Sequence, residues 1–289
     1  STHGIASGPV SFMRIFNMAT DVIKQGGTRR GANMGILRVD HPDILQFIGL
    51  KQDRSEMNNF NLSVGLTAEF MRALKRRGRY ALINPRTGKT TRQLPARMVF
   101  DCLAQAAWAT GEPGVIYLDR INAANPTPEL GEIEATNPCG EQPLLPYESC
   151  TLGSIDVSKF VLRTNAAPTI DYGRLGETIG LVVRFLDDVI DRNHYPLKEI
   201  EVATLRTRKI GLGVMGFADL LIALNVSYDS EAAIALATSL MSCVQAGAHE
   251  VSQQRGHHRG VLPTYHGSRL ESRREQRRNA RTPRRRIAD

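Results

Sequence analysis

Cysteine is scarce in this sequence, with four residues among 289. So few cysteines do not make a disulfide-stabilised scaffold, which small secreted domains build from a dense cysteine framework. We therefore expect a reducing compartment, in which each cysteine is either buried or chemically reactive. Cys102 and Cys243 lie within apolar helical patterns, which favours burial for both.

Long hydrophobic runs are also missing. No apolar stretch approaches the ~20 residues of a membrane-spanning helix, and residues 1–4 show neither the charged nor the apolar region of a signal peptide. We therefore expect a cytoplasmic protein with no membrane contact. Its 42% hydrophobic and 23% charged residues are typical of a globular chain that buries a substantial core.

Positive charge is concentrated at one end of the chain. The formal net charge is +8, and residues 269–289 supply +6 of it through nine arginines and three acidic residues. This segment has too few apolar residues for a core, which predicts a domain over 1–268 followed by an Arg-rich irregular tail over 269–289. A non-catalytic basic fragment that binds nucleic acid is one hypothesis, and its binding should collapse between low and moderate salt.

Apolar spacing predicts helices that alternate with strands. Helical patterns cover 11–24, 98–110, 174–192 and 229–248, and strand patterns cover 34–39, 60–66 and 115–118. This alternation is typical of an α/β fold with parallel strands. Residues 122–148 hold five prolines and little periodicity, which indicates a long functional loop.

The most informative part of this loop is Asn-Pro-Cys-Gly-Glu-Gln at 137–142. Asn137, Cys139 and Glu141 are two residues apart, and side chains at that spacing share one side of an extended chain. Pro138 favours an extended Asn137. The pattern predicts an extended finger that presents an amide, a thiol and a carboxylate together, although spacing alone leaves a surface loop with a chance cysteine as the alternative.

Residues 137–150 closely resemble the active-site finger loop of ribonucleotide reductases. Within it, the sequence of 137–142 resembles that of the adenosylcobalamin-dependent class, class II. Further ordered matches occur at 4–9, 25–35, 59–64 and 208–216, so that the resemblance covers about 1–267. It implies an α/β fold that is part of a ten-stranded α/β barrel with an active-site finger loop, incomplete at both ends of this chain.

The resemblance implies a role for each residue of the finger. Cys139 matches the cysteine whose thiyl radical abstracts the 3′ hydrogen of the ribose, Glu141 the general base for the 3′ hydroxyl, and Asn137 the amide that orients the ribose hydroxyls and so binds substrate. Cys150 matches one member of the redox pair, whose partner lies upstream of this chain. The radical would come from adenosylcobalamin, because side chains alone cannot initiate it.

Nucleotide-binding residues follow from the same resemblance. Ser7 lies where the family holds its substrate. Residues 26–33 match the loop that contacts the specificity effector, a deoxynucleoside triphosphate, and Arg29 and Arg30 suit its phosphates because guanidinium groups bind phosphate oxygens in pairs.

A second loop, 51–58, matches the segment that relays effector identity to the substrate base. Its candidates for effector binding are Lys51, Gln52 and Arg54. The implied ligands are a ribonucleotide substrate, which is either a diphosphate or a triphosphate, and the effector. The implied protein partners are a thioredoxin-like reductant, which a small dithiol could replace, and a second copy of the chain. In this homodimer, helix 11–24 would lie near the interface.

Other interpretations of the sequence are weaker. The large subunit of a class I reductase, with a radical from a diiron subunit, is the nearest one, but the eleven residues from Cys139 to Cys150 favour the cobalamin class. The Gly-x-Gly-x-x-Gly pattern at 211–216 is not expected to bind a dinucleotide, because the preceding 200–209 reads as a helix. No metal site is predicted, since the histidines lack ligand spacing.

Overall fold

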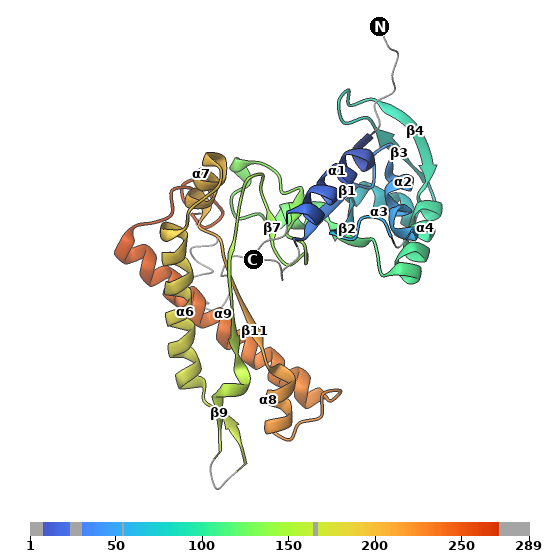
Figure 1. The fold of residues 1–289 in the computed structure, drawn as a ribbon. Coiled ribbons are helices and arrows are strands. Elements are labelled where there is room, and N and C mark those ends of the chain that lie inside the picture. Colours follow the sequence, from blue (N-terminus) through green and yellow to red (C-terminus); the bar gives the residue numbers. More distant parts are fainter. Residues whose placement is uncertain (1–7, 24–30, 54, 164–166, 272–289) are drawn as a thin grey trace. The chain divides into compact units, whose positions relative to one another are not determined.

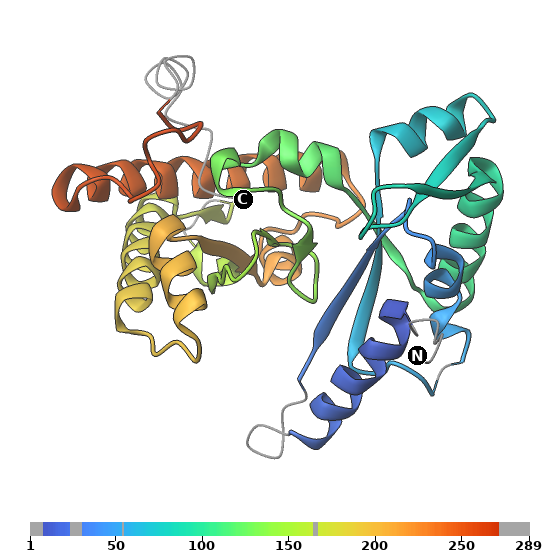
Figure 2. The ribbon, with the colours of Figure 1, turned by 90° about the horizontal axis from the view of Figure 1, so that it is seen from above.

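The computed structural model describes residues 8–23, 31–53, 55–163 and 167–271, which Figures 1 and 2 draw in colour. The chain divides into two compact units. The first unit comprises Ser1–Asn125 and Glu132–Pro146, and the second comprises Pro126–Gly131 and Tyr147–Asp289. Most of the Arg-rich segment 269–289 lies outside the described residues.

A three-stranded parallel sheet organises the first unit. Its order is β1 (Asn33–Arg38), β2 (Phe60–Leu66) and β5 (Gly114–Tyr117), with Asn33 opposite Phe60 and Ser63 opposite Gly114. Helical segments occupy the connections, as parallel pairing requires. They are α2 (Ile44–Ile48), the 3₁₀ helix η1 (Leu50–Gln52), α3 (Ala68–Lys75) and α4 (Ala96–Thr110). The strand predicted at 60–66 is confirmed at those bounds.

The remaining elements of the first unit flank this sheet. Helix α1 (Gly8–Val22) precedes β1, and α5 (Leu118–Ala124) follows β5. An antiparallel hairpin, β3 (Arg79–Ile83) with β4 (Thr90–Pro95), lies between α3 and α4. The α/β class is therefore correct, although the architecture is mixed and not purely parallel.

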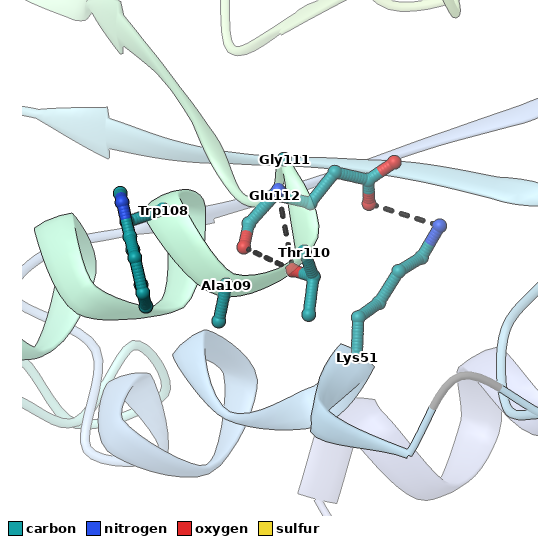
Figure 3. A pocket seen from close by; sticks show the side chains of 6 residues that line it. All are labelled: Lys51, Trp108, Ala109, Thr110, Gly111 and Glu112. Carbon is teal, nitrogen blue, oxygen red and sulfur yellow. Dashed lines mark hydrogen bonds and ion pairs between the residues drawn. The ribbon is translucent and has the colours of Figure 1, made fainter.

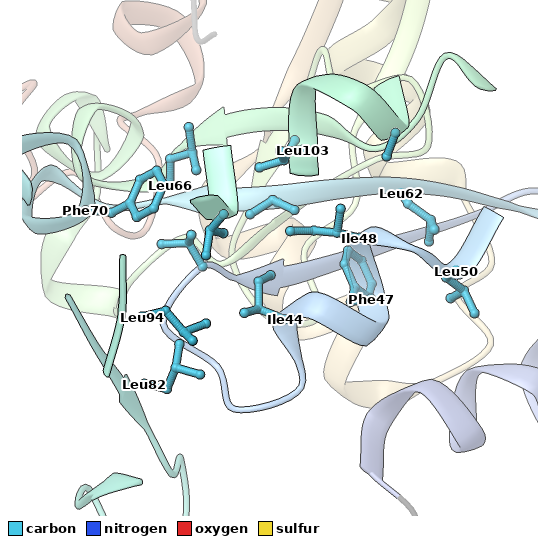
Figure 4. Packing of buried hydrophobic residues seen from close by; sticks show 14 of the residues in the cluster. Ile44, Phe47, Ile48, Leu50, Leu62, Leu66, Phe70, Leu82, Leu94 and Leu103 are labelled. Carbon is cyan, nitrogen blue, oxygen red and sulfur yellow. The ribbon is translucent and has the colours of Figure 1, made fainter. Parts of the chain in front are cut away.

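Buried side chains from the sheet and its helices form one core in this unit (Figure 4). The central strand β2 is buried at every position except Asn61, since helices and strands cover both of its faces. Phe70 of α3 is fully buried and meets the Tyr80 ring edge-on at 4.9 Å. The Tyr80 hydroxyl donates to the Val39 carbonyl at 3.0 Å, and burial raises the pKa of this phenol.

The second unit is built on a parallel strand pair. β8 (Thr151–Asp156) pairs with β11 (Ile210–Met215), and Thr151 lies opposite Ile210. Its helices are α6 (Tyr172–Arg192), α7 (Lys198–Thr207), α8 (Phe217–Ala223) and α9 (Glu231–Arg259), and the 3₁₀ helices are η2 (Pro128–Leu130) and η3 (Val157–Phe160). A small antiparallel pair joins β9 (Val161–Leu162) to β10 (Thr169–Ile170).

The glycine pattern at 211–216 starts inside a strand. Gly211 and Gly213 are part of β11, and α7 precedes it as expected. A β-carbon on Gly213 would come within 3.0 Å of the Ser154 hydroxyl on β8, so this glycine allows the two strands to pack closely. A dinucleotide fingerprint needs its glycines in the turn after a strand, so the pattern serves packing here.

Ionic contacts join the helices of the second unit. Acidic side chains of α6 face arginines from α9 and from the end of α7. The residues are Asp187, Asp188, Asp191, Arg208, Arg255 and Arg259. Hydrogen bonds from Arg208 lower the pKa of Asp191. The network fixes α6 against α9, and apolar residues of both helices fill the core between them and the strand pair.

Helix α9 is, by length and composition only, the one helix among the described residues that is long and apolar enough to cross a membrane. A single helix of this kind is weak evidence, because core helices of globular proteins pass the same test. Leu240, Val244 and Ala248 of α9 belong to the core cluster of the second unit. The helix is therefore not a clear membrane span.

The described strands do not close into a barrel. They form one three-stranded sheet and four strand pairs. The sheet β1-β2-β5 and the pair β8-β11 are parallel and carry helices in their connections, which is the arrangement of an α/β fold.

The core of the first unit gives a stability prediction. Phe70→Ala should lower the free energy of unfolding by about 3–5 kcal/mol, because it removes a fully buried ring and leaves a cavity beside Tyr80. Phe100→Ala, which truncates a ring 39% exposed on α4, is the matched control and should cost clearly less. Urea unfolding of both variants measures the difference, and equal losses would contradict this assignment of the core.

Candidate active site

The predicted finger is the tip of a short hairpin in the first unit. β6 (Ala135–Thr136) pairs in antiparallel fashion with β7 (Pro143–Leu144), with Ala135 opposite Leu144. The segment 122–148 is therefore more ordered than a plain loop, since it also contains the end of α5 and the turn η2. The hairpin presents residues 137–142 at its tip.

A tight turn forms this tip. The Gly140 N–H donates to the Asn137 carbonyl at 3.0 Å, which closes a four-residue turn from Asn137 to Gly140. Asparagine in the first position, proline in the second and glycine in the fourth are the preferred residues of such a turn. Gly140 has a φ of +83°, a left-handed conformation that glycine adopts at little cost.

The prediction of an extended finger is wrong at its centre. Pro138 and Cys139 occupy the middle of the turn, so side chains do not alternate regularly from Asn137 to Glu141. The physical reason is that proline has two effects. It keeps the residue before it extended, as we expected, but its own fixed φ also suits the second position of a turn. The hydrogen bond to Gly140 decides between a straight strand and a turn.

Asn137 closes the hairpin with both its backbone and its side chain. Its N–H donates to the Gln142 carbonyl at 3.1 Å, and its Oδ1 accepts from the Gln142 N–H at 3.0 Å. This use of Oδ1 leaves the Nδ2 amide group as the part of the side chain suited to donate to a bound hydroxyl. The structural contacts and the predicted orienting role are therefore compatible.

Cys139 and Glu141 are both exposed, and Cys139 is a free thiol. Within the described part of the chain, neither side chain makes a hydrogen bond or an ion pair, so the hairpin alone does not hold them against each other. The exposed thiol and the exposed carboxylate are two residues apart in the chain, and both are open to a ligand at the tip.

Two further residues of this region escaped the sequence analysis. The exposed Asn61 of β2 donates its Nδ2 to the Pro138 carbonyl at 2.5 Å, which ties the turn to the sheet. Gln142 is buried, and its Oε1 accepts no hydrogen bond from the described residues. A buried acceptor of this kind is unusual in a folded protein and suits a donor from a ligand or water. The sequence marks Asn61 only as a polar residue within the strand pattern of 60–66 and does not indicate Pro138 as its partner.

Cys150 belongs to the second unit and lies directly before β8. It forms no disulfide with the described residues and is half-buried, with its Sγ 3.9 Å from the Thr151 carbonyl. Cys102 and Cys243 are also half-buried, and each packs against the core of its own unit. Burial raises the pKa of the Cys243 thiol, which lowers its reactivity at neutral pH.

The predicted nucleotide-binding residues are described only in part. Ser7, Arg29, Arg30 and Arg54 lie outside the described residues. Lys51 lies in η1, and its ammonium forms an ion pair with Glu112 at 2.9 Å and donates to the Phe60 carbonyl. Gln52 is exposed beside it.

A hollow of about 460 Å³ lies where Lys51 meets the end of α4 (Figure 3). Trp108, Thr110 and Glu112 are among its lining residues, and the Trp108 ring is 90% exposed. The Glu112 carboxylate also accepts from the Leu62 N–H at 3.2 Å, so it joins Lys51 to the start of β2. Lys51 is therefore held in place, and the expected contact with a nucleotide base would compete with Glu112. Neither Trp108 nor Glu112 was among the residues predicted from the sequence.

The turn at the hairpin tip gives the second prediction. Gly140→Ala should destabilise the first unit by about 1 kcal/mol, because its positive φ strains any residue with a β-carbon, although that carbon would meet no atom within 4 Å. Gly49→Ala is the matched control, since Gly49 has a φ of −83°. Urea unfolding compares the two variants. A Gly140→Ala variant no less stable than Gly49→Ala would contradict the left-handed conformation.

Comparison with known proteins places this geometry in context. The model of the family "Ribonucleotide reductase, barrel domain" matches residues 1–286. A "Vitamin B12-dependent ribonucleoside-diphosphate reductase" of Thermoplasma acidophilum is 52% identical over 94% of this chain and 35% of its own length. The Mycobacterium tuberculosis (strain H37Rv) protein of the same name is 52% identical over 97% of this chain and 39% of its own length.

A more distant relative is the "Ribonucleoside-diphosphate reductase large chain" of Neurospora crassa, which is 29% identical over 92% of this chain and 32% of its own length. The chain thus spans between 35% and 40% of the relatives at 52% identity. The family model covers nearly all of the chain, and the hairpin with Asn137, Cys139 and Glu141 lies within the match. The chain belongs to the ribonucleotide reductase family.

Proposed function

We propose that this chain is a catalytic segment of an adenosylcobalamin-dependent ribonucleotide reductase, which makes deoxyribonucleotides for DNA synthesis in the cytoplasm. The observation that carries the proposal is the free, exposed thiol of Cys139 at a hairpin tip between Asn137 and Glu141, in a chain of this family. The names of the relatives at 52% identity support vitamin B12 dependence and a ribonucleoside diphosphate as substrate.

The nearest alternative is the large subunit of a class I reductase. The Neurospora crassa relative, named a large chain, supports it at 29% identity. The relatives named as B12-dependent reach 52% over a similar share of the chain, which favours the cobalamin class. The non-catalytic nucleic-acid-binding hypothesis depends on the Arg-rich tail alone and does not account for the family match over 1–286.

Each residue of the finger has a chemical task in this proposal. The Cys139 thiyl takes the hydrogen atom from C3′ of the ribose and returns it at the end of the cycle. The Glu141 carboxylate accepts the proton of the 3′ hydroxyl, and the Asn137 Nδ2 donates to a ribose hydroxyl and fixes its orientation. The substrate-binding role of Ser7 comes from the family resemblance.

Among the described residues, Cys139 has the properties that reaction with adenosylcobalamin requires. When bound, adenosylcobalamin supplies the radical that removes the hydrogen atom of a thiol. Such a thiol must be reduced, outside any disulfide and reachable from the surface of its domain, and Cys139 meets all three conditions in the structure. It is therefore the residue of this chain that would face the cofactor.

The reduction needs two electrons, which the proposal assigns to thiols. The C2′–O bond breaks and a C2′–H bond forms, so two electrons and two protons enter and one water leaves. Cys150 and a second cysteine upstream of residue 1 supply them and become a disulfide. A thioredoxin-like protein or a dithiol then reduces that disulfide.

Regulation and architecture complete the proposal. A deoxynucleoside triphosphate would bind at 26–33 through Arg29 and Arg30, and Lys51, Gln52 and Arg54 would read its identity. The parallel sheet β1-β2-β5 and the parallel pair β8-β11 would be parts of a ten-stranded α/β barrel over 1–268, completed by segments outside this chain, with 269–289 as an irregular tail.

The cysteine roles are tested by single substitutions in the full-length protein. Cys139→Ser should lower reduction at least ~10³-fold, because an alkoxyl radical is far harder to form than a thiyl, and should also abolish exchange of a label at C3′. Cys150→Ser should keep that exchange and lose repeated turnover. Cys243→Ser, at a half-buried thiol outside both roles, is the control. Label exchange that survives in Cys139→Ser would refute the assignment.

Helix α1 carries the evidence for a homodimer. Its large apolar side chains are mostly uncovered, and Phe12, Ile15, Phe16 and Val22 are each more than half exposed. A stripe of this kind on a helix is unusual at a free surface and typical of helix–helix interfaces. We propose that α1 packs against a second copy of the chain.

The dimer prediction uses one charge placed on this stripe. Ile15→Lys should raise the dimer dissociation constant about tenfold or more in the full-length protein, because it buries an unpaired charge at the interface. Leu181→Lys is the matched control, since Leu181 is an equally exposed apolar residue on α6. Sedimentation equilibrium measures both. A dimer constant unchanged by Ile15→Lys would exclude α1 from the interface.

A further inference from the structure

The segment that carries Cys150 holds a buried ion pair. The Glu148 carboxylate and the Lys209 ammonium lie 2.6 Å apart, and their side chains are 1% and 3% exposed. Glu148 is two residues before Cys150, and Lys209 is the last residue before β11. None of the other ion pairs among the described residues is buried to this extent.

Two neighbouring contacts anchor the same segment. The Ser149 hydroxyl lies 2.7 Å from the hydroxyl of Thr204, which is 1% exposed on α7. On the other side of Cys150, the Thr151 N–H donates to the Lys209 carbonyl at 3.4 Å, and Thr151 begins the parallel ladder opposite Ile210. Residues on both sides of Cys150 are thus fixed to the end of α7 and the start of β11.

The position of Lys209 is itself constrained. Arg208 ends α7 in a left-handed conformation, with a φ of +48°, and its guanidinium bonds Asp187 at 2.9 Å and Asp191 at 2.7 Å on α6. A non-glycine residue in this conformation persists only where its surroundings hold it. Arg208 thus binds α6, and the next residue, Lys209, binds Glu148.

Stability alone is a poor reason for such a pair. Removing two charges from water is costly, and well-packed apolar side chains in their place are often neutral or stabilising. What an ion pair adds is a fixed geometry between the two segments that carry it. Here those segments are the residues just before Cys150 and the start of β11.

We propose that Glu148 and Lys209 form a clamp that positions the Cys150 thiol, and that both are positioning residues for its redox step. The proposal rests on the redox role proposed above for Cys150. A disulfide forms only within a narrow range of Cα separations, ~4.4–6.8 Å, so a thiol that must pair, be reduced and pair again in every cycle needs a fixed backbone. The clamp supplies that constraint through residues 148–151.

The test removes both charges together in the full-length protein. Lys209→Met alone would leave a buried carboxylate without its partner and could unfold the chain, whereas Glu148→Gln with Lys209→Met leaves no buried charge and keeps the side-chain volumes. The matched control is Lys198→Met with Glu201→Gln, which removes an exposed Lys–Glu pair of 2.9 Å from α7. Thr204→Val, which removes the hydroxyl partner of Ser149, is a second variant at the same segment.

The first measurement is the rate at which iodoacetamide alkylates Cys150, followed by mass spectrometry of its peptide. Cys243, a half-buried thiol of the same unit, is the internal reference. Loss of the clamp should raise the Cys150 rate about tenfold through local opening and leave the Cys243 rate unchanged. Thr204→Val should act in the same direction, and the control pair should have no effect. An unchanged Cys150 rate, or an equal rise at Cys243, would overturn the proposal.

The second measurement separates the clamp from the proposed function. In an active enzyme, loss of the clamp should lower kcat about 10–100-fold with an unchanged KM, because a small displacement of a reacting group is enough for such a loss. An unchanged kcat in the folded double variant would overturn the positioning role. If the wild-type protein reduces no ribonucleotide, the proposed function fails, and the alkylation rates still decide whether the clamp positions Cys150.

Discussion

Parallel strand pairing is the constraint on which both units depend. In a parallel pair, the residues that precede the two strands meet at the same edge of the sheet. Glu112 lies two residues before β5, and it forms an ion pair with Lys51 of η1, whose ammonium also donates to the Phe60 carbonyl at the start of the neighbouring strand β2. Glu148 and Lys209 lie just before the paired strands β8 and β11, and they form the buried pair beside Cys150. Residues about 60 apart in sequence become partners in both units for one topological reason.

The two cysteines for which we propose chemical roles are presented in different ways. Cys139 lies at the tip of an antiparallel hairpin, where local hydrogen bonds between Asn137, Gly140 and Gln142 define the backbone and the thiol is exposed. Cys150 lies directly before a parallel strand and is half-buried. Its neighbours Ser149 and Glu148 contact residues that are distant in sequence. A thiol that exchanges a hydrogen atom with a ligand needs access, whereas a thiol that forms a disulfide needs a fixed position.

Several arginines outside the Arg-rich tail serve the fold. Arg208, Arg255 and Arg259 are matched by aspartates of α6, and these contacts hold α6, α9 and the start of β11 together. Such a network is satisfied within the protein and offers little to nucleic acid. The sequence-based conclusion that the basic character is concentrated in 269–289 agrees with this use of the arginines.

The sequence by itself determined the class of fold and the family. Apolar periodicity located β2 at its observed bounds and the helices α4 and α6 to within two residues at each end, because burial of one face imposes a regular spacing. The ordered motifs identified the ribonucleotide reductase family, which the family model confirms. These features are local, or are repeated along the chain. They can be recognised without knowing which segments are in contact in the folded protein.

The tertiary structure decided the remaining features. The finger contains a turn and not a continuous strand, because a hydrogen bond from Gly140 to Asn137 outweighs the alternation that the spacing suggested. The partnership of Asn61 with Pro138, and that of Glu148 with Lys209, have no signal in the sequence, because the chain between the partners spans whole helices and strands. Long-range polar contacts depend on which strands become neighbours, and only the folded sheet establishes that order.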